Sequence, residues 1–196
     1  MVKSSTRSVC SGCRRAAHSG IGLRQDAILL AFGRVRPQAD VSIYVSIKPM
    51  RPVFDTSPYL WTDDGSLRDV YIQRMGPKQW ERFDSIVRKY ELAYSFDGSR
   101  APFPGSLALF ANREGSHLLS VILGQVIINC HFFVDWQLEL DISPREISGP
   151  TEHDAVLDFV EQLSVELELP ADITPENSET TPFMTYSPTT HSWMLH

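Results

Sequence analysis

The chain has 196 residues, a formal net charge of −6 at pH 7 and a composition that is ordinary for a soluble globular protein. No apolar run approaches the roughly 20 residues that a membrane-spanning helix needs, which argues against a transmembrane protein. The three cysteines, without an export signal, indicate reduced thiols rather than a disulfide framework, and we expect a cytoplasmic protein.

Charge is divided unevenly along the chain. Residues 1–60 hold nine Lys/Arg and three Asp/Glu, a net of +6, whereas residues 115–196 hold thirteen Asp/Glu and one base, Arg145, a net of −12. An acidic body repels nucleic acid and membrane phosphates and attracts basic proteins. We therefore expect neither a nucleic-acid nor a membrane partner. One interpretation of the acidic charge is that the protein binds a basic protein. The other interpretation is that the acidic surface only keeps the protein soluble. A homodimer is also possible on this sequence.

The N-terminal part differs in composition from the rest. Residues 1–36 are rich in Ser and Arg and are predicted to be a poorly ordered basic extension, ahead of a single α+β domain over residues 37–196. Cys10 and Cys13 form a lone CxxC without a second ligand pair, and Asp63-Asp64-Gly65 is typical of a turn. We expect no metal and no cofactor.

The elements follow in chain order from an imperfect edge strand at residues 41–47. Residues 67–75 alternate as a strand, Gly76-Pro77 opens a helix that runs to about Tyr90, and an aromatic stripe gives this helix an apolar face. Further on we expect a strand at 91–96, a short helix at 105–112, a helix from residue 150 to Pro170, a strand at 171–174 and a hairpin of 183–186 with 192–195.

Residues 117–142 are predicted to be three consecutive antiparallel strands. Gly124-Gln125 suits a type II′ turn, because Gly stands where positive φ is required, and Leu123 then faces Val126. The loop at residues 134–136 leads to a third strand whose apolar residues join the same face. A slip by one residue would turn every apolar side chain to the wrong side, so the agreement of two turns supports the register.

The other face of these strands is polar. It gathers five side chains: Ser120, Asn129, His131, Glu139 and Asp141. A histidine opposite a glutamate is a candidate general acid/base pair, so a small hydrolase or isomerase that uses His131 and Glu139 is one hypothesis. The chain has no nucleophile elbow, Walker loop, dinucleotide-binding glycines or HExxH motif that would indicate a substrate for this histidine. Cys130 points to the apolar face, so it serves packing and forms no dyad with His131.

The helix from residue 150 is expected to cover the apolar face of the hairpin. Thr151 is its predicted N-cap, and Asp154, Asp158 and Glu161 lie on its outer side. Arg145, which precedes it, is expected to anchor a carboxylate inside the fold. Together the elements predict an α+β fold: a mainly antiparallel sheet with two long helices packed on one face.

Three short motifs carry a resemblance: CHFF at 130–133, DISPREI at 141–147 and ITPENS at 173–178. With these motifs, the region from Tyr59 onward resembles small bacterial α+β proteins of unassigned function and is similar in style to immunity proteins that neutralise a toxin. The resemblance implies a non-enzymatic, acidic protein-binding module with a basic partner. The expected contacts are Glu139, Asp141, Asp154, Asp158 and Glu161.

Overall fold

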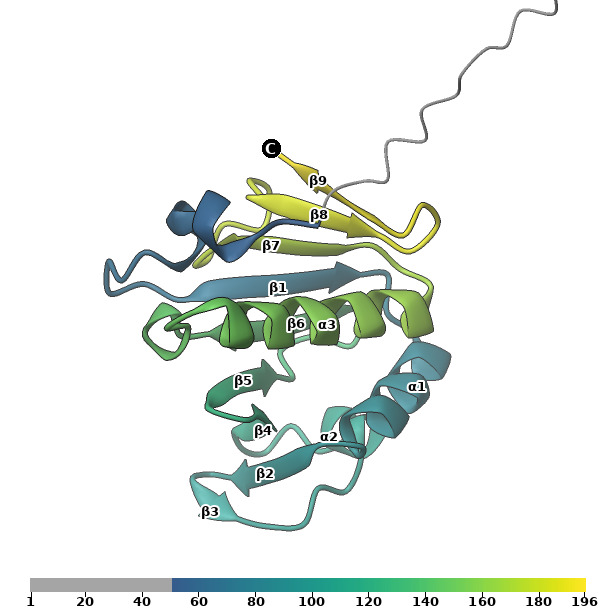
Figure 1. The fold of residues 1–196 in the computed structure, drawn as a ribbon. Coiled ribbons are helices and arrows are strands. Elements are labelled where there is room, and N and C mark those ends of the chain that lie inside the picture. Colours follow the sequence, from purple (N-terminus) through teal and green to yellow (C-terminus); the bar gives the residue numbers. More distant parts are fainter. Residues whose placement is uncertain (1–50) are drawn as a thin grey trace, which may run out of the picture. The chain divides into compact units, whose positions relative to one another are not determined.

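The computed structural model describes residues 51–196, and every strand in this range joins one antiparallel sheet (Figure 1). The sheet has nine strands in the order β3-β2-β4-β5-β6-β1-β7-β8-β9. Their bounds are β1 Arg68–Gln73, β2 Glu91–Phe96, β3 Ser99–Arg100, β4 His117–Leu123, β5 Val126–His131, β6 Gln137–Ile142, β7 Ala171–Pro175, β8 Met184–Ser187 and β9 Ser192–Leu195.

The three central strands have the predicted register. Leu123 pairs with Val126 and Leu119 with Cys130, and in the next ladder Cys130 pairs with Leu140. Gly124 has φ +67°, as the two-residue turn requires. The prediction of a three-residue loop before β6 is wrong, because β5 ends at His131 and the connection spans residues 132–136.

Two long helices lie on one face of the sheet, as expected. Figure 1 shows α3, Pro150–Leu167, along the middle strands, and α1, Pro77–Val87, beside it; the short α2, Ser106–Ala111, contacts α1. The apolar side of α3 is buried: Val156, Phe159, Val160, Leu163 and Leu167. Their burial against the apolar sheet face forms one core, so the described residues fold as a single α+β domain.

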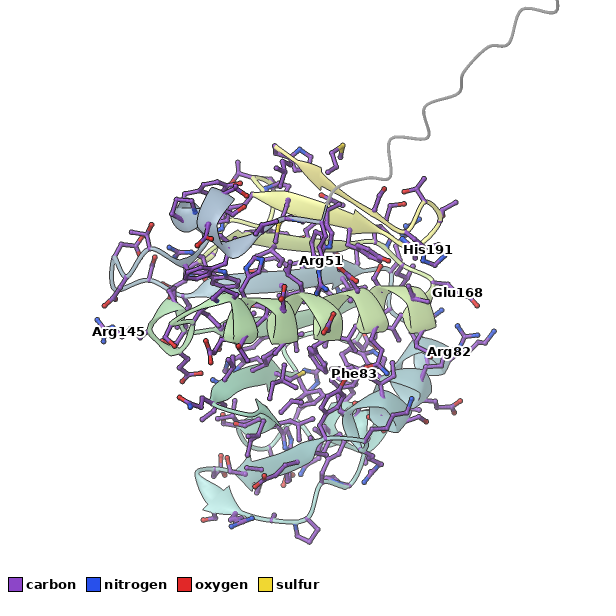
Figure 2. All side chains as sticks on the ribbon, in the orientation of Figure 1. Arg51, Arg82, Phe83, Arg145, Glu168 and His191 are labelled. Carbon is purple, nitrogen blue, oxygen red and sulfur yellow. The ribbon has the colours of Figure 1, made fainter. Side chains whose placement is uncertain are left out.

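Two details of α3 and its approach differ from the predictions. Gly149, not Thr151, is the N-cap, because Pro150 occupies the first helical position that proline favours. Arg145 does bind a carboxylate, with Nε 2.9 Å from Asp63 Oδ1, but both side chains are exposed. Figure 2 shows Arg145 projecting from the domain, so the expectation of an anchor inside the fold is wrong.

The predictions for residues 1–50 lie outside the described residues. They are the basic extension 1–36, the Cys10/Cys13 pair, the edge strand 41–47 and the start of the domain at residue 37. Among the helices of residues 51–196, none combines the length and the apolar character needed to cross a membrane.

Candidate functional site

The face of the sheet opposite α1 and α3, here called the outer face, carries the predicted polar cluster. Cross-strand pairing places Ser120 beside Asn129, Asn129 beside Asp141, and His131 beside Glu139. All five residues of the predicted cluster therefore lie together, on strands whose alternate residues fill the core.

A chain of hydrogen bonds connects four of these residues. Ser120 Oγ donates to Asn129 Oδ1 at 2.8 Å, and Asn129 Nδ2 donates to Asp141 Oδ1 at 3.0 Å. The second carboxylate oxygen of Asp141 lies 2.6 Å from His131 Nε2. Asp141 therefore uses both oxygens and is the centre of the network.

The carboxylate that orients His131 is Asp141 and not Glu139. Glu139 is directly opposite His131 in the ladder, yet Asp141, one diagonal position away, makes the hydrogen bond. This bond raises the pKa of His131 above its ordinary value, against the opposing effect of partial burial. Glu139 is opposite His131, as expected, but it does not make the hydrogen bond to this imidazole.

Strand β1 adds two residues that the sequence analysis did not assign to the cluster. Asp69 pairs with Asp141 and Tyr71 with Glu139 across the β1–β6 ladder. The Tyr71 hydroxyl donates to Asp69 Oδ2 at 3.0 Å, and burial is the largest cause that raises the pKa values of both groups. The alternation of β1 was visible in the sequence, but no local signal indicates that β1 lies next to β6.

The segment that follows β7 covers this part of the outer face. The Asn177 backbone N–H donates to Asp69 Oδ2 at 2.7 Å, and the Glu176 carboxylate accepts the Leu67 backbone N–H at 3.0 Å. Gln73 and Glu179 are also hydrogen-bonded. As a result Asp69 is buried, whereas Asn129, His131 and Glu139 stay half-exposed.

Glu139 is the least compensated carboxylate near the network. Among the described residues its side chain has one long contact, 3.5 Å between Tyr71 Oη and Glu139 Oε1, and the single Tyr71 proton is directed to the closer Asp69. Burial and the nearby Asp69 charge raise the pKa of Glu139. This carboxylate is therefore available to a cation that approaches the outer face.

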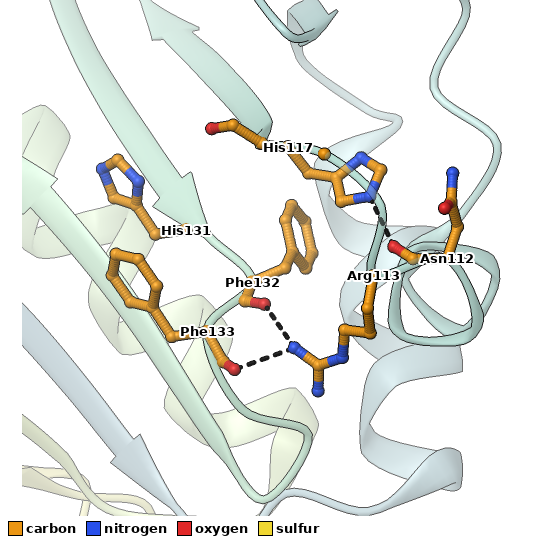
Figure 3. A pocket seen from close by; sticks show the side chains of 8 residues that line it. Asn112, Arg113, His117, His131, Phe132 and Phe133 are labelled. Atoms are coloured by element: carbon orange, nitrogen blue, oxygen red, sulfur yellow. Dashed lines mark hydrogen bonds between the residues drawn. The ribbon is translucent and has the colours of Figure 1, made fainter.

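A cavity of about 260 Å³ lies beside His131, at the end of the sheet where β4 begins (Figure 3). Arg113 reaches across it and donates to the backbone oxygens of Phe132 and Phe133. His117 Nε2 lies 2.8 Å from Asn112 O, and its Nδ1 lies 2.7 Å from the Tyr94 hydroxyl. Both nitrogens of His117 are thus engaged, in keeping with a structural histidine.

The loop residue Phe133 lies flat against the imidazole of His131. The two ring centroids are 5.2 Å apart and the planes differ by 3°. Phe133 is exposed, so one face of the His131 ring is shielded by an apolar side chain that is itself in contact with solvent.

The predicted partner-binding residues fall into two groups on opposite sides of the domain. Glu139 and Asp141 lie on the outer face, whereas Asp154, Asp158 and Glu161 lie on the solvent side of α3. Arg51 forms ion pairs with Asp158 at 2.8 Å and with Glu161 at 3.1 Å. The five residues therefore lie on two surfaces, the polar face of the sheet and the outer side of the helix, and their contact with a partner stays a prediction.

Within residues 51–196, no group of three or more His, Cys, Asp and Glu side chains is arranged to hold a metal ion. Cys130 is a free cysteine in the core, and burial raises the pKa of its thiol well above the ordinary value. Comparison with protein-family models, with curated proteins and with solved structures finds no match to the chain.

Proposed function

We propose that the protein is a non-enzymatic, acidic protein-binding module whose outer face binds a basic partner. One observation carries the proposal. Outward positions of β1, β2 and β4–β9 hold no lysine or arginine and five carboxylates, of which Asp69 is buried: Asp69, Glu91, Glu139, Asp141 and Asp172. The edge strand β3 adds one base, Arg100, opposite Ser95. A surface on which one sign of charge predominates favours encounter with the opposite sign and disfavours like-charged molecules.

The contact proposed at the centre is Glu139, with Asp141 behind it. Asp141 already binds Asn129 and His131, so its proposed role is to orient the network. The half-exposed Glu139 has a free oxygen that can bind a lysine or arginine. Asp158 and Glu161 are compensated by Arg51 and belong to the other side of the domain. The proposed contact surface is therefore the outer face alone.

The resemblance to immunity proteins adds a class of partner, a basic toxin that the module neutralises. The proposal keeps the expected cytoplasmic setting, where a thiol such as Cys130 stays reduced. The proposal includes no nucleic-acid or membrane partner, because the carboxylates of the outer face repel phosphate groups.

A charge-reversal pair tests the outer face. The full chain and two variants, Glu139→Lys and Asp154→Lys, are titrated with poly-L-lysine of defined length, with poly-L-glutamate as the negative probe. Both substitutions change the net charge equally, but Glu139 is on the outer face and Asp154 on the solvent side of α3. We expect Glu139→Lys to weaken binding about tenfold and Asp154→Lys to weaken it much less.

Equal weakening by the two variants would mean that poly-L-lysine responds to net charge only, and would contradict a site on the outer face. Binding should also weaken steeply as salt increases, because exposed charges are screened. Retention of poly-L-lysine at high salt would contradict an electrostatic contact.

The cavity beside His131 supports a second candidate function, a small hydrolase or isomerase. With Nε2 held by Asp141, the imidazole is oriented as in a general acid/base pair, and Glu139 lies opposite it. Under this candidate, His131→Ala abolishes turnover of a substrate while the folded circular-dichroism spectrum is kept. An activity that survives His131→Ala would exclude it.

A further inference from the structure

The two edges of the nine-stranded sheet are built differently. At one edge, β3 has only two residues, Ser99 and Arg100, and prolines 102 and 104 follow it. Short length, a charged side chain and nearby prolines are the usual protection of an edge strand against pairing with another chain. At the other edge, β9 has four residues, Ser-Trp-Met-Leu, with no charge and no proline.

The side chains of β9 reinforce this contrast. Met194 is 57% exposed and Leu195 is 55% exposed, one on each face of the strand, whereas Trp193 is buried and donates its indole N–H to Glu161. No described segment pairs with the free side of β9, because β8 is its single neighbour in residues 51–196. Two adjacent large apolar side chains on an uncovered strand edge are a feature of interaction surfaces.

The β8–β9 ladder shows which backbone groups of β9 face the free edge. The His196 N–H donates to Phe183 O, so this opposed pair is hydrogen-bonded. Hydrogen-bonded and non-hydrogen-bonded pairs alternate along an antiparallel ladder, and Thr185 is opposite Met194. Met194 therefore bonds to β8, while the N–H and C=O groups of Trp193 and Leu195 point outward.

We propose that β9 pairs antiparallel with β9 of a second copy of this chain, across a two-fold axis at Met194. In this register the edge-facing groups of Trp193 bond to those of Leu195 of the second copy, and the reverse, which makes four backbone hydrogen bonds. The two Met194 side chains meet on the outer face. Each Leu195 packs beside the other copy's Trp193 on the helix-covered face.

The register is chosen by the side chains. For a two-fold axis perpendicular to the sheet, opposed side chains of the two strands point to the same face only when one residue stands opposite the same residue of the second copy. An axis at Trp193 would place Ser192 opposite Met194, and would leave His191 opposite Leu195. The axis at Met194 instead pairs apolar residues with apolar residues and opposes no like charges, which is why a second copy suits this edge.

The dimer is expected to be weak, since two four-residue strands bury less than a standard interface. Its dependence on salt separates it from the proposed function. Two copies with a net charge of −6 repel each other, so added salt should strengthen the dimer, whereas it weakens binding of poly-L-lysine to the outer face.

Disulfide cross-linking tests the register in the full chain, with Cys10→Ser and Cys13→Ser as background. At the axis, opposed residues form a non-hydrogen-bonded pair with Cα atoms about 4.5 Å apart, within the range of a disulfide. Residues 195 of the two copies would be about 8 Å apart, beyond that range. We expect Met194→Cys to form a disulfide dimer on oxidation, and Leu195→Cys, the matched control, to stay largely monomeric.

Sedimentation velocity over a concentration series gives a second measurement. Met194→Lys should abolish the dimer by placing two positive charges against each other, while Ile127→Lys, which adds the same charge at another exposed site on the outer face, should leave it intact. A chain that is monomeric at every concentration and salt level would overturn the proposal. So would Trp193 and Leu195 amides that exchange slowly at all dilutions, because the edge would then be covered from within one chain.

Discussion

The Nε2 atom of His131 lies 2.6 Å from Asp141 Oδ2, although Glu139 is the residue directly opposite His131 in the β5–β6 ladder. The diagonal contact exists because Asp141 is also fixed from its own opposite residue, Asn129, through its other oxygen. His131 thus belongs to the hydrogen-bonded network of the outer face, whereas Glu139 has only a long contact with Tyr71 among residues 51–196.

This pair predicts a specific dependence of stability on pH. The hydrogen bond to Asp141 raises the folded-state pKa of His131 above the ordinary 6.5. Its contribution to the free energy of unfolding is therefore fully present below pH 6.5 and is lost as the pH rises through the raised folded-state pKa. Urea denaturation at a series of pH values, together with NMR titration of the His131 ring protons, measures both quantities.

Asp141→Asn and Glu139→Gln form a matched pair for that titration. Asp141→Asn removes the hydrogen-bonded charge, so the pKa of His131 should fall toward its ordinary value, whereas Glu139→Gln removes only a weaker electrostatic contribution and should lower it less. A larger decrease in Glu139→Gln than in Asp141→Asn would contradict the assignment.

A buried hydrogen bond holds the segment before β1 against α3. The indole of Trp61 donates to His153 Nδ1 at 2.8 Å, and His153 Nε2 donates to Pro52 O at 3.0 Å. Trp61→Phe keeps most of the ring but leaves the Nδ1 acceptor unsatisfied, which should reduce the free energy of unfolding by about 2 kcal/mol. Trp136→Phe, at an exposed site, should change it by less than about 0.5 kcal/mol in the same urea denaturation.

The turn between β4 and β5 depends on positive φ at one residue. Gly124 has φ +67°, and a Cβ placed there would contact no atom within 4 Å. Gly124→Ala should therefore cost about 1–2 kcal/mol through backbone strain alone. Gln125→Ala in the same turn should cost little, and thermal unfolding of the two variants compares them. Equal melting temperatures would contradict the strain.

Arg68 and Arg145 allow a comparison between the stability effects of a buried and an exposed arginine. Arg68 is buried and donates to Leu60 O at 2.7 Å and Thr62 O at 2.8 Å, whereas the Arg145 ion pair is exposed. Arg68→Lys cannot reproduce the forked geometry, and we expect it to reduce the free energy of unfolding by about 3 kcal/mol. Arg145→Lys should have an effect under about 0.5 kcal/mol. Chemical denaturation that ranks the two in the reverse order would refute this contrast.

Some details of the elements were predicted incorrectly for local reasons. Phe132 continues the apolar alternation of β5, so the pattern extended the strand past its true end at His131. Thr151 is a good capping residue, but the proline before it takes the first helical position and moves the cap to Gly149. In both cases two local signals competed, and the sequence does not say which one prevails.

The order of the strands was beyond local reasoning. β1 lies between β6 and β7, and this placement brings Asp69 against Asp141, 72 residues later in the chain, and Tyr71 against Glu139, 68 residues later. Contacts between distant segments depend on how whole faces pack, and periodicity within a segment carries no record of its neighbour.

By itself, the sequence determined the α+β class, the register of β4 to β6, the split of Cys130 and His131 onto opposite faces, and the apolar side of α3. These follow from turn chemistry and from repeats of two and 3.6 residues, which act over a few positions. Only the tertiary structure decided which carboxylate holds His131, which residues of β1 join the polar cluster, and that β9 lies at an edge of the sheet formed by residues 51–196. Those relationships arise where separate elements meet, because packing of the core chooses the neighbours.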